Sequence, residues 1–280
     1  MLAGRLPTVR RLVHLKLLQV FQYGPPYANE RGLNDAVTTA LRFGFTGLLV
    51  KALDGTDWMS KYDRSPDALD SIESVARQAA LASMSGLYFF CWTNPRRDVD
   101  TMLQASLTSR VAKACDGVFL DVEPYPQFWG DGAPPGLAAA FMESIREGAP
   151  DAFIALQPDP RPVALDQIRI HEWLPFVDAF AGQHYWTDFG TNPTDELASA
   201  IMLGKTLHKP IVPTLPGAIS GTTAPVELLG QLPGLIVWRM GTANSESLRT
   251  LGGINVTGSF SAKLQRRRTV RADQIVVAYD

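Results

Sequence analysis

Short apolar runs alternate with longer amphipathic stretches along most of the chain. The runs are rich in β-branched and aromatic residues, and each ends in polar, glycine or proline residues. Eight such runs occur, at residues 17–23, 47–53, 86–92, 117–123, 152–157, 179–185, 210–215 and 234–238. They are apolar almost throughout, as expected for strands of a parallel sheet that is covered on both faces. The pattern therefore predicts eight buried strands.

Helix candidates with apolar residues at three- and four-residue spacing lie between these strands. The longer ones span 66–84, 99–114, 136–147 and 194–207, and shorter ones span 34–43, 165–173, 226–231 and 246–251. Asp98 and Asp195 stand where N-caps or acidic first-turn residues are favoured. Eight strands alternating with helices leave a closed barrel or an open doubly wound sheet. The number eight, and the lack of a glycine-rich phosphate loop after the first strand, favour an α/β fold of the (β/α)₈ barrel type.

The barrel is expected to occupy residues 1–253. Residues 254–280 break the repeat with two alternating pieces, 256–260 and 275–279, joined by the basic run 266–268. They predict a short C-terminal β extension. It is either a hairpin packed on the barrel or an arm for self-association.

Composition agrees with a globular protein that has a full core. Of its 280 residues, 46% are hydrophobic and 19% are charged. The net charge is −2 and the isoelectric point about 6.1, so no basic field favours nucleic acid as a partner. Two cysteines, Cys91 and Cys115, make neither a disulfide framework nor a zinc site.

The N-terminus superficially resembles a signal peptide, because arginines precede an apolar stretch. His14 and Lys16 interrupt that stretch, and no small-residue cleavage site follows it. No segment approaches the roughly 18 apolar residues of a membrane span. We therefore expect no signal peptide and no membrane span, and a cytoplasmic or phage-associated protein.

The fourth run carries the strongest candidate chemistry. Active sites of such barrels lie at the carboxyl ends of the strands. Side chains alternate along a strand, so Phe119, Asp121 and Glu123 share the inward face. Two buried carboxyls are costly unless they share a proton or hold a substrate, and one should then have the raised pKa of a general acid. Alternatively, the two acids cap loops or pair with Lys51 or Arg239.

The segment 116–125 (DGVFLDVEPY) resembles the strand-four signature D-G-x-D-x-D-x-E of family-18 chitinases and related glucosaminidases. Asp116, Gly117, Asp121 and Glu123 match it, and Phe119 replaces the middle aspartate. The shorter pattern, an apolar run followed by D-V-E, more loosely resembles family-25 lysozymes. Those barrels cleave peptidoglycan and have an early aspartate on strand one, where this chain offers only Gln19 and Gln22.

The resemblance implies a glycoside hydrolase acting on a β-linked N-acetylhexosamine glycan, either peptidoglycan or chitin-like, without metal or organic cofactor. Glu123 would be the general acid and Asp121 would orient and stabilise the substrate acetamido group. Tyr185 would hold the acetamido carbonyl, and Trp238 would form the floor under the sugar.

Other polar and aromatic residues near strand ends are candidates for substrate binding, because flat apolar sugar faces stack on aromatic rings. These candidates are Lys51, Asp54, Tyr88, Trp92, Tyr125, Gln157, Gln183 and Arg239. Asp54 equally fits a loop turn with Gly55. His184 has no His or Cys partner at metal spacing, so we interpret it as structural or substrate-facing.

Two other functions compete with hydrolysis. The first is a non-catalytic glycan-binding or structural barrel, for example in a phage tail or cell-envelope assembly, which Phe119 in the motif would fit. The second is a metabolic barrel that acts on phosphorylated substrates. It is weaker, because the seventh and eighth runs end without a convincing glycine-rich phosphate loop.

Overall fold

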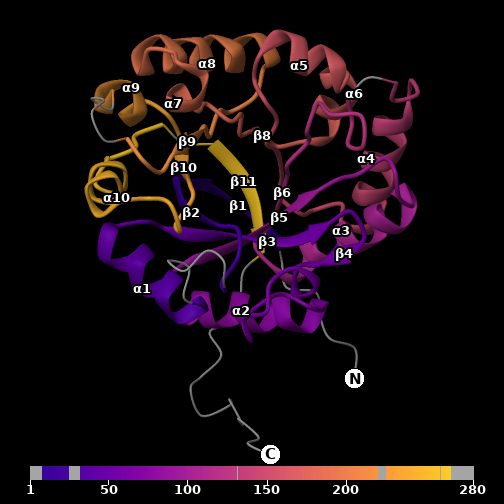
Figure 1. Ribbon diagram of the computed structural model, residues 1–280, viewed down its shortest axis with the longest axis horizontal. Helices are drawn as coiled ribbons and strands as arrows, with labels where there is room; N and C mark the ends of the chain where they lie inside the picture. The colour runs from indigo at the N-terminus through magenta and orange to yellow at the C-terminus, as the bar shows by residue number, and fades with distance from the viewer. Residues whose placement is uncertain (1–7, 25–31, 131, 220–224, 259, 266–280) are drawn as a thin grey trace, which may run out of the picture.

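In the computed structural model, eight parallel strands form the centre of the molecule and helices surround them (Figure 1). The structure describes residues 8–24, 32–130, 132–219, 225–258 and 260–265. The strands are β2 (Leu15–Val20), β3 (Gly47–Asp54), β5 (Tyr88–Asn94), β6 (Val118–Leu120), β7 (Ile154–Leu156), β8 (Ala179–Phe180), β9 (Thr214–Pro216) and β10 (Gly234–Trp238). They pair in the order β8-β7-β6-β5-β3-β2-β10-β9, and the short β4 (Asp57–Trp58) pairs only with β3.

The two ends of this order also meet, which closes the sheet into a ring. Isolated parallel bridges join Phe180 to Ile211 and Gln183 to Thr214. The amide of Val212 donates to the Phe180 carbonyl over 2.9 Å, and the amide of His184 donates to the Thr214 carbonyl over 2.8 Å. The predicted (β/α)₈ barrel is therefore confirmed.

The helices form an outer ring around the strands (Figure 1). They are α1 (Leu33–Phe43), α2 (Ile72–Met84), α3 (Thr101–Ala114), α4 (Leu137–Gly148), α5 (Pro162–Gln167), α6 (Ile170–Trp173), α7 (Trp186–Phe189), α8 (Pro193–Leu207), α9 (Val226–Gly230) and α10 (Ser245–Gly252), with 3₁₀ turns η1 (Met59–Lys61) and η2 (Leu174–Phe176). Each expected helix is present, and the 165–173 segment divides into two.

Local hydrogen bonds explain where two of the long helices begin. Asp100, rather than Asp98, caps α3 by accepting from the amides of Met102 and Leu103. The Asp98 carboxylate instead accepts from Arg96. Asn192 caps α8, which places Asp195 in the first turn, where a negative charge is favoured.

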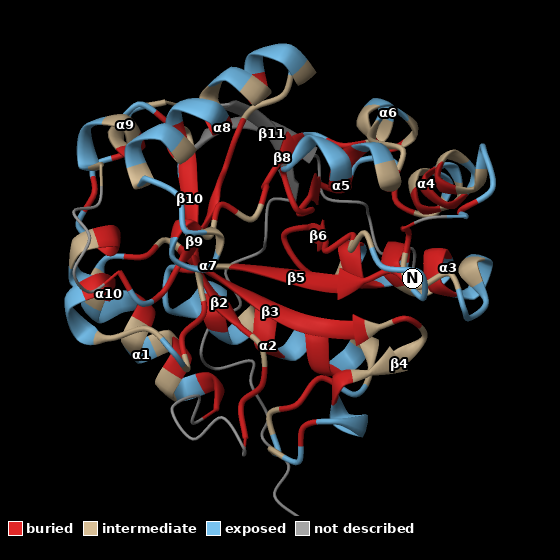
Figure 2. Ribbon diagram, turned by 45° about the horizontal axis from the view of Figure 1, so that its top comes forward, coloured by how far each residue is buried: buried red, intermediate tan, exposed pale blue. Residues whose placement is uncertain are grey.

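Alternation along the strands divides the core into two layers. Val118, Leu120 and Val122 belong to the larger cluster, between the strands and the helices. Phe119 belongs to the smaller cluster inside the barrel, together with inward-facing residues of the other strands. Figure 2 shows the central strands as buried and the outer helix faces as exposed.

A separate two-stranded sheet lies outside the barrel, formed by one strand before and one strand after the barrel strands in the sequence. β1 (Thr8–Val13) pairs antiparallel with β11 (Phe260–Gln265), and only His14 separates it from β2. The pair therefore lies at the amino ends of the barrel strands, and Figure 1 shows β11 crossing the middle of the ring. Residues 275–279, the second half of the expected hairpin, lie outside the described residues. The boundary at residue 254 and the hairpin therefore stay predictions.

Candidate active site

Asp121 and Glu123 lie just beyond the carboxyl end of β6. The Asp121 amide still donates to the Thr93 carbonyl of β5 over 2.9 Å, so the parallel ladder continues past the last residue of β6. Asp121 is 9% exposed and Glu123 is partly buried. The two carboxyls thus lie on the inner face of the barrel, at the rim that the alternation of β6 predicts.

Two amide side chains hold these carboxyls together. Asn94 Nδ2 donates to Asp121 Oδ2 over 2.7 Å. Gln183 Nε2 is 2.7 Å from Asp121 Oδ1 and 3.3 Å from Glu123 Oε1, so one amide spans both acids. Asn94 ends β5 and Gln183 follows β8, which places donors from both sides of the barrel on the pair. Asn94 was not anticipated, although it lies two residues after the inward-facing Trp92.

Burial raises the pKa of both carboxyls. The pKa of Asp121 lies well above its usual range, because Asp121 is removed from water and faces the negative charge of Glu123. Burial also raises the pKa of Glu123, and the nearby charge of Asp159 adds to this, while the hydrogen bond from Gln183 opposes it. The pair consequently favours retention of a proton, which a general acid needs.

A layer of neutral polar side chains supports the pair from within the barrel. Gln157 Nε2 is 2.9 Å from Gln19 Oε1 and 2.8 Å from Thr214 Oγ1. The Thr214 hydroxyl in turn donates a hydrogen bond to the Ala181 carbonyl over 3.0 Å. Gln183 Nε2 also lies 3.2 Å from the Gln157 carbonyl oxygen. Gln157 therefore lies beneath the site, where it is 1% exposed and its backbone carbonyl accepts from Gln183.

Aromatic rings fill the barrel below these polar residues. Phe119 packs against Phe90 and Phe153, with ring centroids 5.6 and 5.8 Å away. Phe119 and Phe90 are fully buried, and Phe153 is 1% exposed. Phe119 therefore occupies the position of the middle motif aspartate as a packing residue.

The other matched motif residues have structural roles. Asp116 Oδ2 accepts from the Phe89 amide over 2.8 Å, which fixes the start of β6 against β5. Gly117 has φ 149°, and a β-carbon there would lie 2.5 Å from the Phe153 carbonyl oxygen. This close approach of β6 and β7 requires glycine. Asp116 and Gly117 thus hold the strand that carries Asp121.

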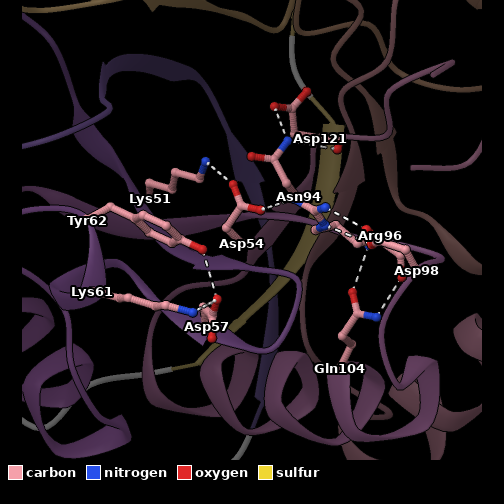
Figure 3. A network of polar contacts seen from close by, with 10 residues as sticks. All are labelled: Lys51, Asp54, Asp57, Lys61, Tyr62, Asn94, Arg96, Asp98, Gln104 and Asp121. Carbon is pink, nitrogen blue, oxygen red and sulfur yellow. Dashed lines mark hydrogen bonds and ion pairs between the residues drawn. The ribbon is translucent and has the colours of Figure 1, made fainter. Parts of the chain in front are cut away.

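A buried lysine lies beside the carboxyl pair. Lys51 is 5% exposed, and its Nζ is 2.8 Å from Asp54 Oδ2. Arg96 also contacts Asp54, at 3.4 Å, and this chain of charges borders the Asn94–Asp121 contact in Figure 3. The charge of Lys51 lowers the pKa of Asp121 and of Glu123, which partly offsets their burial.

Three rings form an aromatic wall next to the pair. Phe21, Trp92 and Trp238 have centroids 5.8 to 6.1 Å apart. Lys51 Nζ lies 4.9 Å from the Phe21 centroid, and the Arg239 guanidinium carbon lies 5.4 Å from it. Phe21, which follows β2, was not anticipated as a site residue. Its place two residues after the inward-facing Gln19 is the signal that would have found it.

A cavity of about 530 Å³ opens against this wall. The ends of β9 and β10, the start of α7 and Phe21 line it, and its residues include Phe21, Thr187, Asp188, Gly217, Trp238 and Arg239. Asp121, Glu123 and Tyr185 are not among its described lining residues. Tyr185 immediately precedes α7, and burial raises the pKa of its hydroxyl well above the usual range, with the charges of Asp121, Glu123 and Asp188 adding to this.

Of three further substrate-binding candidates, Tyr88 lies elsewhere than predicted, whereas Trp92 and Tyr125 lie near the carboxyl ends of their strands as expected. Tyr88 is the first residue of β5, so it lies at the amino end of the barrel, opposite Glu123. Tyr88 is also the third residue of the predicted run 86–92, so chain direction already placed it nearer the amino end than the rim. Trp92 is 1% exposed, and its Nε1 donates to the Val20 carbonyl over 3.1 Å, so it supports the wall from behind. Tyr125 is 54% exposed beyond β6, on the outer rim.

His184 faces away from the carboxyls, toward α8. Its Nδ1 lies 2.9 Å from Glu196 Oε1, and its Nε2 is buried without a hydrogen-bond partner. The hydrogen bond and charge of His184 lower the pKa of Glu196. In the part of the chain that the structure describes, no group of three or more His, Cys, Asp or Glu side chains is placed to hold a metal ion. No helix among the described residues is long and apolar enough to cross a membrane.

The strands, their closure and the surrounding helices define a (β/α)₈ barrel. No protein-family model and no curated protein matches the sequence. The fold is similar to that of concanavalin B, with 12% identity and a TM-score of 0.56 over 86% of this chain and 98% of that one. A family 18 chitinase from Crocus vernus has 13% identity and a TM-score of 0.55, over 85% and 98%. A GH113 β-mannanase from Alicyclobacillus acidocaldarius has 13% identity and a TM-score of 0.54, over 86% and 92%. Identities this low establish a shared fold.

Proposed function

We propose that this protein is a glycoside hydrolase that cleaves a β-linked N-acetylhexosamine glycan, either peptidoglycan or chitin-like. The observation that carries the proposal is the buried pair of Asp121 and Glu123 at the rim of the barrel, bridged by Gln183. Two carboxyls with raised pKa values, placed next to an aromatic wall and a cavity, supply acid catalysis beside a surface that suits sugar rings.

In the proposed first step, Glu123 donates its proton to the glycosidic oxygen. The bond between that oxygen and the anomeric carbon breaks, and the bonding electrons leave with the oxygen. The carbonyl oxygen of the substrate acetamido group attacks the anomeric carbon and closes a positively charged ring. Asp121 stabilises that charge through the acetamido N–H, and the Tyr185 hydroxyl donates to the acetamido oxygen. This is the substrate-assisted form of glycoside hydrolysis.

In the second step, water attacks the anomeric carbon and reopens the ring. Glu123, now a carboxylate, takes the proton from that water and returns to its starting state. Glu123 therefore ends the cycle with a proton, as it began. The cycle as proposed needs no metal and no redox partner. Lys51 remains paired with Asp54 beside the carboxyls and moderates their pKa values.

The non-catalytic alternative also has a supporting observation. Phe119 places a packed ring below Asp121 in place of a third carboxyl. A barrel that only binds glycan would need the aromatic wall and the cavity, and it would not need an acid of raised pKa. Hydrolysis is favoured because the Asp121–Glu123 pair is costly to bury and no other role for it is evident from its contacts.

Replacing the acid while keeping its shape separates the two functions. General acid–base catalysis contributes about 10²- to 10⁴-fold, so Glu123→Gln should lower kcat on peptidoglycan or chitin oligomers by at least about 10²-fold. Binding should persist, because the amide still hydrogen-bonds sugar hydroxyls. Asp121→Asn should also lose rate, since a neutral amide stabilises the positive ring poorly.

The matched control is Asp57→Asn, which changes a half-exposed carboxylate of β4 that pairs with Lys61 and whose described contacts do not include Asp121 or Glu123. It should leave kcat unchanged. A wild-type protein that binds these oligomers without releasing product, with the same affinity as Glu123→Gln, would establish the binding function instead. Failure to bind any glycan would end the carbohydrate proposal.

A further inference from the structure

A second cavity lies at the opposite end of the barrel from the carboxyl pair. Its volume is about 420 Å³, within the roughly 300–1,000 Å³ that is usual for small-molecule sites. It is lined by the last two turns of α8, by the chain that leads into β9, and by Leu232 between α9 and β10. Since α8 and α9 are neighbours in the outer ring (Figure 1), the cavity lies beside both helices, at the amino ends of the strands.

The floor of this second cavity is apolar. Ile211 and Leu232 are buried there, and the half-buried Ile201 of α8 completes the apolar lining. A ligand whose apolar part covers this floor removes further apolar surface from water, and this favours binding.

Two lysines and a histidine also line the cavity. Lys205 is in the last turn of α8, His208 ends that helix, and Lys209 follows it. Lys205 and His208 are exposed, whereas Lys209 is half-buried and its Nζ donates to the Val177 carbonyl over 2.7 Å. An ammonium group has three N–H donors, so Lys209 can donate two more hydrogen bonds. None of the described lining residues is acidic, so the cavity combines an apolar floor with a positive charge.

The backbone at His208 is unusual for its residue type. Its φ is 51°, and among the described residues only Arg169 is another non-glycine residue with positive φ. A helix that ends in this conformation usually has glycine there, because a β-carbon disfavours it. The helix dipole alone favours a lysine in the last turn, such as Lys205. It does not account for a histidine in the position of glycine, and this indicates a use for the imidazole at the cavity.

We infer that the second cavity binds a phosphate monoester that carries an apolar group. A lysine ammonium is a compact charge with donors in several directions, which suits the tetrahedral oxygens of a phosphate. A carboxylate is better matched by the planar fork of arginine, and no arginine is among the described lining residues. The apolar group covers Ile201, Ile211 and Leu232. A soluble ester and the headgroup of phosphatidic acid share this chemistry. The inference does not depend on the proposed hydrolysis.

Titration calorimetry on the full-length protein tests the ligand class. Hexyl phosphate is the probe, and inorganic phosphate, hexanoate and hexanol each lack one of its features. We expect hexyl phosphate to bind at least about tenfold more tightly than each of the three, since the apolar chain and the charged hydrogen bonds both contribute. Equal affinity for hexanoate overturns the choice of phosphate, and equal affinity for inorganic phosphate overturns the role of the floor. No binding of hexyl phosphate overturns the whole inference.

Two substitutions locate the binding. Lys205→Gln should weaken hexyl phosphate binding by about tenfold or more, because it removes a charged donor. His208→Gly should also weaken binding while its Tm stays the same or rises, because glycine favours the left-handed end of α8. Lys113→Gln is the control, since Lys113 is an exposed lysine in the last turn of α3, and it should bind as wild type does. Unchanged affinity in either folded variant of the cavity overturns the inference.

Flotation with phosphatidylcholine vesicles, with and without phosphatidic acid, distinguishes the two sources of the ester. Binding of hexyl phosphate together with vesicle binding that requires phosphatidic acid and is lost in Lys205→Gln identifies a lipid headgroup. Binding of hexyl phosphate without vesicle binding identifies a soluble ester. Vesicle binding without binding of hexyl phosphate overturns the inference, because the protein would then recognise the membrane through another surface.

Discussion

The Asp121 carboxyl is buried next to a second acid, so its ionisation opposes folding. Its pKa and that of Glu123 are raised above the ordinary values of 3.8 and 4.5. Over the pH range between the unfolded and folded pKa values, the native state binds more protons than the unfolded state. The free energy of unfolding therefore falls as pH rises through that range. The residues proposed for catalysis thus reduce stability at neutral pH.

Thermal unfolding as a function of pH tests this sign. Asp121→Asn removes the ionisation, so its Tm relative to wild type should rise as pH increases above the ordinary carboxyl pKa of 3.8, until the native carboxyl has ionised. Asp57→Asn should show no such rise, because the pKa of Asp57 is lowered by Lys61 and Tyr62, and that carboxylate loses its stabilising contacts as pH falls. A constant Tm difference for Asp121→Asn at every pH would mean that the pair is not held in its protonated form.

For individual residues, the sequence was informative wherever side chains alternate between the two faces of a strand. It placed Asp121 and Glu123 on the inner face because the side chains of β6 alternate with a period of two. The same rule applied to β5 and β2 would have found Asn94 and Phe21. Alternation gives the face of a strand and chain direction gives its end, so the position of Tyr88 early in the run 86–92 argued against its assignment to the carboxyl rim. The cavity at Arg239 lies between the loops that follow β9 and β10. These loops meet only in the folded barrel, so neither segment alone predicts the cavity.

Among the elements, β8 matters most for the site, because Gln183 follows it and contacts both carboxyls. It also has the least regular structure. It spans only Ala179–Phe180, although the apolar pattern predicted a strand over 179–185. Beyond Phe180 the chain stays in place through the Gln183–Thr214 bridge and the bond of His184 to Glu196 in α8. The strand prediction was too long here and for β6, since neighbouring strands end their pairing earlier than the apolar runs end.

The His184–Glu196 contact should position the residues on either side of it. Gln183 spans the two carboxyls and Tyr185 faces them electrostatically, and both flank His184. Glu196→Ala should therefore lower kcat on a cleaved glycan by about tenfold or more, as small misplacements of catalytic groups do. Glu196→Gln keeps an acceptor for Nδ1 and should restore most of the rate. If both variants keep the wild-type kcat and only their Tm values fall, the contact serves stability alone.

For the whole molecule, the two-stranded sheet ties the beginning of the described chain to its end. β1 enters β2 directly, and β11 pairs with β1 in a continuous antiparallel register from Thr8–Gln265 to Val13–Phe260. This pairing joins segments about 250 residues apart, so no local sequence pattern could reveal it. The apolar alternation near residue 260 predicted a strand and not its partner.

Two truncations examine what the C-terminal segment does. A chain that ends at Gly258 loses β11 and leaves β1 without its partner strand, so we expect a lower Tm at unchanged oligomeric state. A chain that ends at Gln265 keeps β11 and serves as the control, with a Tm close to that of the full chain. The assembly-arm alternative predicts the reverse: light scattering would show a smaller oligomer while the Tm of either truncation stayed near wild type.

The packed rings of Phe90, Phe119 and Phe153 turn the barrel into a dead end beneath Asp121. Water, substrate and protons then have one common entrance at the carboxyl rim. A glycan seated over the pair would cut it off from bulk solvent, so the water of the second step can reach the anomeric carbon only after the leaving sugar has moved away. The departure of the first product would then control the entry of that water, and the same water restores the proton of Glu123.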